Sequence, residues 1–183
     1  MRIDPLLRSG RLAFHPLSLE ELVLYVKAED RLERQLGLSS CRREVSPDVR
    51  DMVEFYSLPK MKFASREAQL FLTFWIVIDV DLNQIVAELG FKGTPDQNSE
   101  IEIGYGTLPH QQGKGYMTEA LAAMCKWALA RADVRGVLAE TDQSNLASIK
   151  VVTKNGFVQF DQRDKMLWWR KKRPSIQQRS PYN

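Results

Sequence analysis

The spacing of hydrophobic and polar residues changes several times along this chain, and each change predicts a boundary between two elements. Residues 12–17 are predicted to form a short first strand. Residues 20–36 have helical spacing, and Ser18 followed by Glu21 is typical of a capped helix start. A Ser-Pro-Asp sequence opens a second helical stretch over residues 46–56. The first third of the chain is therefore predicted to be a strand followed by helices.

Strand patterns dominate the middle of the chain. Residues 70–78 are rich in β-branched and aromatic side chains, residues 79–83 supply a turn, and residues 84–92 are a suitable partner strand. Together they predict a hairpin. A second turn follows at residues 93–99. Residues 100–108 then alternate apolar and polar side chains, as expected for a strand whose two faces differ.

The last third of the chain predicts both helices and strands. In order, a long helix, a short strand, a short helix and two more strands are expected over residues 118–132, 137–140, 147–154, 157–161 and 165–170. Asn155 and Gly156 are expected at a left-handed helix end, so they should stop the short helix. The whole order predicts an α/β (α+β) fold, in which a mixed central sheet of about seven strands carries helices on both faces.

Length and composition indicate one globular unit. The chain has 183 residues, of which 44% are hydrophobic and 27% charged, and this balance excludes wholesale disorder. No run of Gly, Ser or Pro separates two apolar parts, so we expect a single domain over residues 1–173. Residues 174–183 are polar and are expected to form a flexible C-terminal tail.

The balance of charges limits the class of partner. A formal net charge of +3 is small beside 26 basic and 23 acidic residues, which excludes a cationic nucleic-acid binder by composition. The basic run Arg170–Arg173 is predicted to be the solvated end of the last strand, and contact with phosphates or an acidic partner is the alternative. We therefore expect no nucleic acid among the partners.

Cysteine usage and the lack of long apolar runs bear on the compartment. Cys41 and Cys125 form no CxxC pair and the chain has no histidine cluster, so we expect neither a metal site nor a disulfide. No apolar run reaches the ~18 residues that span a bilayer, and the N-terminus lacks the pattern of a signal peptide. These observations predict a cytoplasmic protein without a membrane partner.

A turn with two glycines follows the strand predicted over residues 100–108. Gly113 and Gly115 can adopt positive φ and let the backbone approach a bulky anion. The helix that begins at about Tyr116 adds the positive end of its dipole, while Lys114 and Thr118 can add a charge and a hydroxyl. These features predict a pyrophosphate site, with a plain strand-to-helix connection as the alternative. The P-loop sequence is absent, because Lys114 is followed by Gly and Tyr instead of Ser or Thr.

The residues around this turn resemble the acetyl-CoA motif of the GNAT superfamily of N-acetyltransferases. The resemblance is carried by Glu102-Ile-Gly-Tyr105, Pro109 and Gln112-Gly-Lys-Gly-Tyr-Met-Thr-Glu-Ala120. It implies that the cofactor phosphates contact Gln112, Gly113, Lys114, Gly115, Tyr116, Met117 and Thr118. Met117 departs from the family pattern, which has Gly or Ala at this place, so the close backbone approach is in question at that amide alone.

A second segment supports the first. Asn145, Ser148 and Lys154-Asn-Gly-Phe157 resemble the later strand-helix motif of the superfamily, in the form used by the ribosomal-protein alanine acetyltransferase branch. The resemblance covers residues 84–160 and implies a mostly antiparallel sheet, splayed open between the strands that end near Leu108 and Glu140 to hold acyl-CoA. It adds Asn145 and Lys154 to the residues expected to bind the cofactor.

The resemblance also implies an activity. The chain is expected to be an acetyl-CoA-dependent N-acetyltransferase that moves an acetyl group to a primary amine by direct attack in a ternary complex, with CoA as the product. The acceptor is a protein N-terminal α-amine or a small-molecule amine. A non-catalytic module that binds or senses acyl-CoA is the alternative, and either a monomer or a homodimer is compatible with the sequence.

The candidate general base is Glu102, because it lies in the strand that must line the cleft and opposes two isoleucines in the alternation. A base matters because a lysine amine, with a pKa of about 10.4, is almost fully protonated at neutral pH. A solvent-facing strand carboxylate is the simpler interpretation of Glu102, and Glu88 and Glu140 are substitutes.

The acid that protonates the leaving thiolate is less clearly marked. Many family members have a Tyr four residues after the place of Ser148, and this chain has Val152 there. Ser148 is the candidate for relaying a proton through its hydroxyl, with helix capping as its simpler role. The N–H groups of Thr107 and Leu108 are expected to be unpaired in the splayed strand and to contact the thioester oxygen and the pantetheine arm.

Two further assignments stay open. Asn145 is expected to bond the amide arm of the cofactor, although a turn residue would satisfy the same sequence. Trp168 and Trp169 are candidates for the acceptor pocket, although adjacent aromatic residues in a strand usually divide between core and surface.

Overall fold

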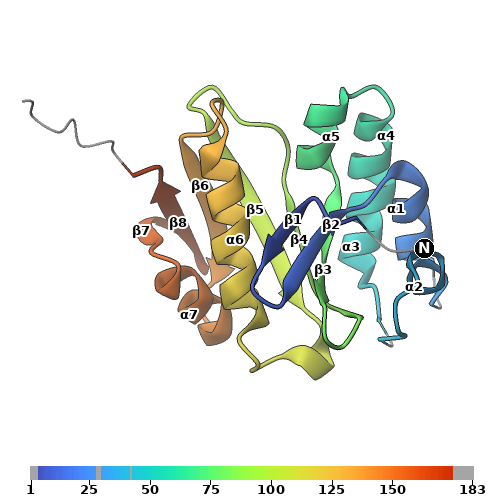
Figure 1. The fold of residues 1–183 in the computed structure, drawn as a ribbon. Helices are drawn as coiled ribbons and strands as arrows, with labels where there is room; N and C mark the ends of the chain where they lie inside the picture. Colours follow the sequence, from blue (N-terminus) through green and yellow to red (C-terminus); the bar gives the residue numbers. More distant parts are fainter. Residues whose placement is uncertain (1–3, 28–29, 42, 175–183) are drawn as a thin grey trace, which may run out of the picture.

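The computed structural model describes residues 4–27, 30–41 and 43–174, which form one open sheet flanked by helices (Figure 1). The strands are β1 (Leu7–Ser9), β2 (Leu12–Pro16), β3 (Phe74–Asp79), β4 (Gln84–Phe91), β5 (Glu100–Thr107), β6 (Gly136–Asp142), β7 (Val158–Arg163) and β8 (Met166–Lys172). Their order in the sheet is β1-β2-β3-β4-β5-β6-β8-β7. The predicted tail lies outside the described residues, apart from its first position.

The α-helices gather on the two faces of this sheet. They are α1 (Leu19–Val26), α2 (Arg31–Leu36), α3 (Pro47–Asp51), α4 (Leu58–Met61), α5 (Arg66–Leu72), α6 (Tyr116–Ala130) and α7 (Leu146–Lys154). Two short helices of other types also occur in the described residues: a π-helix, η1 (Met52–Ser57), and a 3₁₀-helix, η2 (Pro109–Gln111). The α/β class and the mixed sheet are therefore as predicted.

The strand that was predicted over residues 70–78 begins later than expected. Its first three residues belong to α5, because Ser65 caps a helix there by accepting a hydrogen bond from Ala68 N at 3.3 Å. Phe71 is buried in this helix and packs on the ring of Phe91. Burial of the helix against the sheet thus outweighs the strand preference of the apolar run. A second difference is β1, a three-residue edge strand that raises the described strands from about seven to eight.

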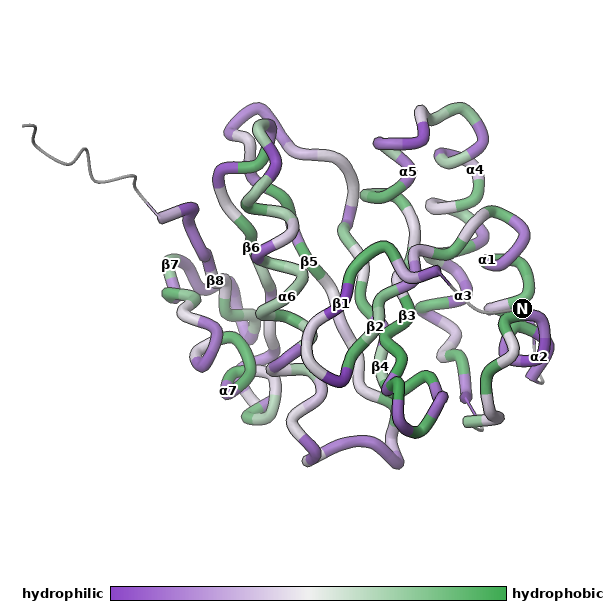
Figure 2. The backbone as a smooth tube through the Cα atoms, viewed as in Figure 1, coloured by the Kyte–Doolittle hydropathy of each residue, from purple (hydrophilic) through white to green (hydrophobic). Residues whose placement is uncertain are grey.

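Two apolar cores lie on opposite faces of the sheet. Phe14 and Val77 belong to the core beneath α6, while their neighbours Ala13 and Ile76 belong to the core beneath α1, α2 and η1. β3 therefore presents apolar side chains to both cores, and Figure 2 shows β3 and β4 coloured apolar along most of their length. Burial on both faces holds these strands rigid, so they can position a site at the point where the sheet divides.

The sheet divides between β5 and β6. These two strands pair in parallel, whereas the other pairs in the described sheet are antiparallel, and their pairing is confined to Glu100, Ile101 and Glu102 of β5. Beyond Glu102, β5 continues to pair with β4 as far as Thr107, but no longer pairs with β6. The predicted splay is confirmed, and residues 103–107 of β5 form one edge of it.

Candidate active site

The glycine turn before α6 has the backbone that the sequence predicts for an anion site. Gly113 and Gly115 have φ of +75° and +81°, and Gly115 is the N-cap of α6. A Cβ built on either glycine would meet nothing within 4 Å, so the glycines are needed for their φ and not for lack of space. The first N–H groups of α6 have no acceptors within the helix and point out of its N-terminus.

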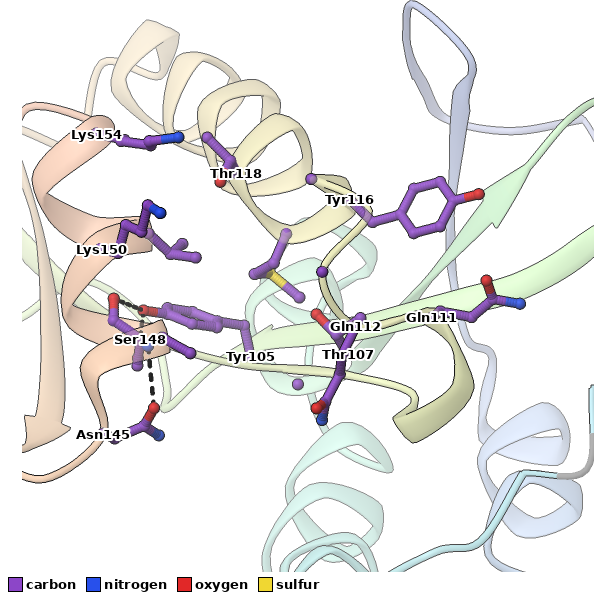
Figure 3. A pocket seen from close by; sticks show the side chains of 16 residues that line it. Tyr105, Thr107, Gln111, Gln112, Tyr116, Thr118, Asn145, Ser148, Lys150 and Lys154 are labelled. Carbon is purple, nitrogen blue, oxygen red and sulfur yellow. Dashed lines mark hydrogen bonds between the residues drawn. The ribbon is translucent and has the colours of Figure 1, made fainter.

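The turn is tied from behind to the edge of the sheet. Arg11 donates to the carbonyl oxygen of Lys114 at 2.8 Å, forms an ion pair with Glu119 at 3.3 Å and lies over the ring of Tyr116. Tyr116 in turn donates its buried hydroxyl to Asp79 at 2.8 Å. Its side chain points away from the cavity (Figure 3), so Tyr116 can meet a ligand only through its backbone.

A cavity of about 530 Å³ lies between this turn and α7. Its lining includes most residues expected to bind the cofactor: Thr107, Gln112, Gly113, Gly115, Tyr116, Met117, Thr118, Asn145 and Lys154. Lys114 does not line it, and its ammonium group donates to Gln111 Oε1 at 2.8 Å. Lys150 lines the same wall as Lys154, one helical turn earlier, and both face the cavity from α7 (Figure 3). The cavity therefore offers two ammonium groups opposite the helix N-terminus.

The prediction that both N–H groups at the end of β5 are unpaired is wrong for Leu108. The N–H of Leu108 is not free, since it donates to the carbonyl oxygen of Val86 at 3.1 Å, and its side chain is buried in the core beneath α1. Successive N–H groups of a strand point to opposite sides, so the N–H of Thr107 points away from β4, towards the side from which β6 has diverged. Of the two predicted oxyanion contacts, only Thr107 retains the required direction.

Two hydroxyl groups meet on the side of β5 that faces the first cavity, which we call the cofactor side. The Tyr105 hydroxyl is 2.8 Å from Ser148 Oγ, and either oxygen can donate in this hydrogen bond (Figure 3). Burial raises the pKa of Tyr105, although its hydrogen bond to Ser148 opposes that change. The cap of α7 is Asn145, whose Oδ1 accepts from Ser148 N at 3.0 Å. The Ser148 hydroxyl is therefore not needed as a helix cap.

A second cavity, of about 330 Å³, lies on the opposite side of β5. Its lining comprises Val49, Met52, Tyr56, Ser57, Thr73, Phe74, Glu88, Leu89, Gly90, Phe91, Lys92, Gly104, Tyr105 and Gly106. Tyr105 and Gly106 also line the first cavity, so the two meet in the stretch of β5 that has no partner in β6. The second cavity exists because Gly104 and Gly106 place no side chains on this face of the strand.

Glu88 lies opposite Gly106, at the junction of the two cavities. It is the cross-strand partner of Gly106, and a Cβ on Gly106 would lie 3.6 Å from Glu88 Oε1. The Glu88 side chain forms no hydrogen bond or ion pair with any other described residue. Burial raises the pKa of its carboxyl to about 7. A carboxyl that ionises near neutral pH beside an open cavity is well suited to proton transfer.

Glu102 occupies a different environment. It forms a close ion pair with Lys92, which also contacts Glu140 at 3.4 Å. Burial lowers the pKa of Lys92, but the two carboxylates more than offset this, and the net direction is upward. Glu102 lines neither cavity, and it lies about 13 Å along β5 from Gly106 at the usual rise of a strand.

The remaining sequence candidates lie outside the lining of the two cavities. Trp169 is buried and donates to Thr141 Oγ1 at 2.9 Å, and neither it nor Trp168 lines the two cavities. Val152 is fully buried in the core, so the place that is Tyr in many relatives does not face the cleft here.

The basic run at the end of β8 is also engaged within the molecule. Arg170 pairs with Glu100 at 2.8 Å, Lys171 donates to the carbonyl oxygen of Asn155, and Arg173 donates to that of Val134. Three of its four cations therefore have partners on neighbouring elements.

Comparison with known proteins decides the family. A family model described as an acetyltransferase (GNAT) domain matches residues 11–158, which is more than half of the chain. This chain belongs to the GNAT acetyltransferase family. That family uses acetyl-CoA, and the motif, the splayed sheet and the cavity on its edge are therefore features of one known architecture.

Individual GNAT relatives agree with this assignment. The chain is 29% identical over 153 residues to an uncharacterized N-acetyltransferase, YjdG, of Bacillus subtilis, covering 84% of this chain and 89% of that protein. The ribosomal-protein-S5-alanine acetyltransferase of Vibrio fischeri superposes with a TM-score of 0.62 at 16% identity, covering 92% and 96% of the two chains. A ribosomal L7/L12 α-N-protein acetyltransferase in complex with coenzyme A gives 0.61 at 15%, covering 90% and 95%. These two structural likenesses show the shared GNAT fold.

Sequence reasoning missed three features of this GNAT site. Tyr105 was part of the quoted motif but had no role, although a tyrosine between Gly104 and Gly106 is conspicuous in a strand. Lys150 lies four residues before Lys154 and therefore on the same helical face, a spacing that was open to inspection. The position of Glu88 opposite a glycine depends on the strand register, which the sequence does not state.

The described part of the chain holds neither a metal-binding cluster nor a membrane-spanning helix. No group of three or more His, Cys, Asp or Glu side chains there could hold a metal ion. No helix in the same residues is long and apolar enough to cross a membrane.

Proposed function

We propose that this protein transfers an acetyl group from acetyl-CoA to a primary amine, by direct attack of the amine while both substrates are bound. The observation that carries the proposal is the meeting of two cavities at Tyr105 and Gly106. One cavity has the features that bind a pyrophosphate, and the other has an unpaired carboxyl. A module that only bound the cofactor would not need the second cavity.

The first cavity fits acetyl-CoA by the chemistry of its walls. The N–H groups at the start of α6 and the ammonium groups of Lys150 and Lys154 are complementary to phosphates. Asn145 keeps its Nδ2 available while its Oδ1 caps α7, so it can donate to an amide carbonyl of the pantetheine arm. Acetyl-CoA supplies the acetyl group as a thioester, which an amine can attack.

The residues at the junction divide the proton transfers between the two faces of β5. Glu88 accepts the proton of the acceptor amine, and its raised pKa suits this task near neutral pH. The Thr107 N–H stabilises negative charge on the acyl oxygen during attack. The Tyr105–Ser148 hydroxyl pair returns a proton to the departing thiolate. We therefore assign Glu88, in preference to Glu102, as the general base.

The test of this function has two steps. Calorimetric titration with acetyl-CoA and with CoA measures cofactor binding, and release of free thiol in the presence of primary amines measures transfer. Amine-dependent thiol release establishes the transferase. Binding of acetyl-CoA without thiol release for any amine would reject it and favour the non-catalytic module.

A further inference from the structure

The second cavity has a composition that selects among amines. Its floor is the bare backbone of Gly104 and Gly106, and Val49, Met52 and Phe74 are apolar members of its lining. A Cβ built on Gly104 would meet nothing within 4 Å, so the space above this glycine is open. Met52 comes from the π-helix η1, a type of turn that is frequent at functional sites.

Most polar groups of this cavity already have partners. The Thr73 hydroxyl donates to the carbonyl oxygen of Leu17 at 2.6 Å, and the Tyr56 hydroxyl donates to that of Lys92 at 2.9 Å. The Lys92 ammonium is held by Glu102 and Glu140. Glu88 lines the same cavity without a hydrogen-bond or ion-pair partner among the described residues.

We propose that the acceptor is a small primary amine that carries one apolar group, with its nitrogen beside Glu88 and its apolar group against Val49, Met52 and Phe74. This inference rests on the proposed function, because it assigns the second cavity to the acceptor. A single unpaired carboxyl matches a single ammonium group. Burial of hydrocarbon against the apolar lining contributes about 25 cal/mol of favourable binding free energy for each Å² removed from water.

Two other acceptor classes fit this cavity less well. A diamine would carry a second ammonium group, and the described lining offers no carboxylate for it besides Glu88, since the other charged member of the lining is Lys92. A peptide N-terminus would bring several amide groups, and these need hydrogen-bond partners. Gly104 and Gly106, which form the floor of this cavity, direct their N–H groups at β4, because they are in phase with Leu108, whose N–H donates to Val86.

The test compares four probes of the same amine chemistry. They are phenethylamine, 3-methylbutylamine, putrescine and a tetra-alanine peptide, and each is tested both for binding and for transfer. Calorimetry in the presence of CoA measures amine binding, and thiol release from acetyl-CoA measures transfer. We expect the two apolar amines to exceed putrescine and the peptide by at least about tenfold in kcat/KM and in affinity.

Gly104 provides the matched variants. Gly104→Ala and Gly104→Val add side-chain volume to the open space without crowding other atoms at Cβ, and Gly104 does not line the cofactor cavity. We expect Gly104→Val to raise KM for phenethylamine about tenfold, Gly104→Ala to raise it less, and the Kd of acetyl-CoA to stay unchanged. Phe55→Ala is the control, because Phe55 lies in η1 but is 76% exposed and does not line the cavity.

Each outcome separates the inference from the function on which it rests. Transfer to putrescine or to the peptide at equal or higher kcat/KM would retain the transferase and overturn the apolar acceptor, and so would an unchanged KM in Gly104→Val. Preferential binding of the apolar amines without any thiol release would retain the acceptor pocket and reject the transferase. Failure of the apolar amines to bind in the presence of CoA would overturn the inference by itself.

Discussion

The two cavities on either side of β5 are built from different kinds of sequence segment. On the cofactor side, the glycine turn, the start of α6 and the face of α7 come from continuous segments, and the anion site is built largely from backbone N–H groups and exposed lysines. On the side proposed for the acceptor amine, here called the acceptor side, Glu88 comes from β4, the glycine floor from β5 and the apolar lining from α3, η1 and β3. The first side is a local motif, whereas the second is assembled by strand register and packing.

This difference suggests how such a fold can change its acceptor. The cofactor side depends on positive φ at two glycines and on a helix N-terminus, so few sequences satisfy it. The acceptor side depends on which side chains fill a cavity of about 330 Å³ above two glycines, and many sequences can satisfy that requirement. The following experiments are arranged to break or sharpen the contrast, beginning with the variant from which we expect the largest effect.

The acceptor side should control the rate of transfer through Glu88. Glu88→Gln keeps the size of the side chain but removes the base, so we expect kcat to fall by about 10²–10⁴-fold with an unchanged Kd for acetyl-CoA. Glu102→Gln is the matched control on the same face, and we expect it to stay within about fivefold of the wild type because it alters a partly exposed ion pair. A larger loss of kcat in Glu102→Gln than in Glu88→Gln would assign the base to Glu102 instead.

The pH profile offers a test of the same carboxyl without changing the fold. The folded pKa of Glu88 is raised from 4.5 to about 7, so the carboxyl is protonated and inactive as a base below that pH and ionised above it. We expect kcat/KM for the amine to rise as pH increases through about 7, by close to tenfold for each pH unit on the acidic side. At each pH, kcat/KM of the wild type is divided by kcat/KM of Glu88→Gln. This ratio isolates Glu88, because the ionisation of the amine and of Lys92, Tyr56 and Tyr105 is common to both proteins. A ratio that does not change with pH would remove Glu88 from the proton transfer.

The hydroxyl pair on the cofactor side should act as one unit. Tyr105→Phe and Ser148→Ala each break the 2.8 Å hydrogen bond between the two residues, and we expect each to lower kcat by about tenfold. The double variant should be no slower than the slower single variant, because groups that act together have non-additive effects. Single-turnover measurement of thiol release isolates this step. Losses that multiply would show that the two hydroxyls act independently.

The sequence predicted the cofactor side far better than the acceptor side, for a physical reason. The turn with Gly113 and Gly115, the start of α6 and the splay next to β5 were all predicted from short motifs and the resemblance that they carry. Glu88 was only a substitute for Glu102, since both carboxylates alternate correctly within their strands. Which of them faces an open cavity is decided by pairing with Gly106 or with Lys92, and this pairing is a property of the folded sheet.

The error at Leu108 has the same origin. The alternation of a strand does not tell which N–H groups point to the paired side and which to the open side, and one residue of register exchanges them. Likewise, the helix cap at Ser65 was not weighed against the apolar run that follows it. Local patterns therefore predicted the elements, and tertiary pairing decided which side chains and N–H groups are available for chemistry.

The smallest expected effect lies on the cofactor side and concerns three lysines. Lys150 and Lys154 face the cavity, whereas the ammonium group of Lys114 donates to Gln111. The structure therefore favours Lys150 and Lys154 for phosphate binding, whereas the sequence motif includes Lys114. We expect Lys150→Ala and Lys154→Ala each to raise the Kd of acetyl-CoA by about three- to fivefold, since exposed ion pairs contribute about 0.2–1 kcal/mol. The effect should shrink at high salt, because exposed charges are screened. Lys114→Ala should have a smaller effect under the same calorimetric conditions. A larger loss in Lys114→Ala would mean that its side chain leaves Gln111 to bind the phosphates, and the sequence motif would then describe the bound state better than the geometry of the free protein does.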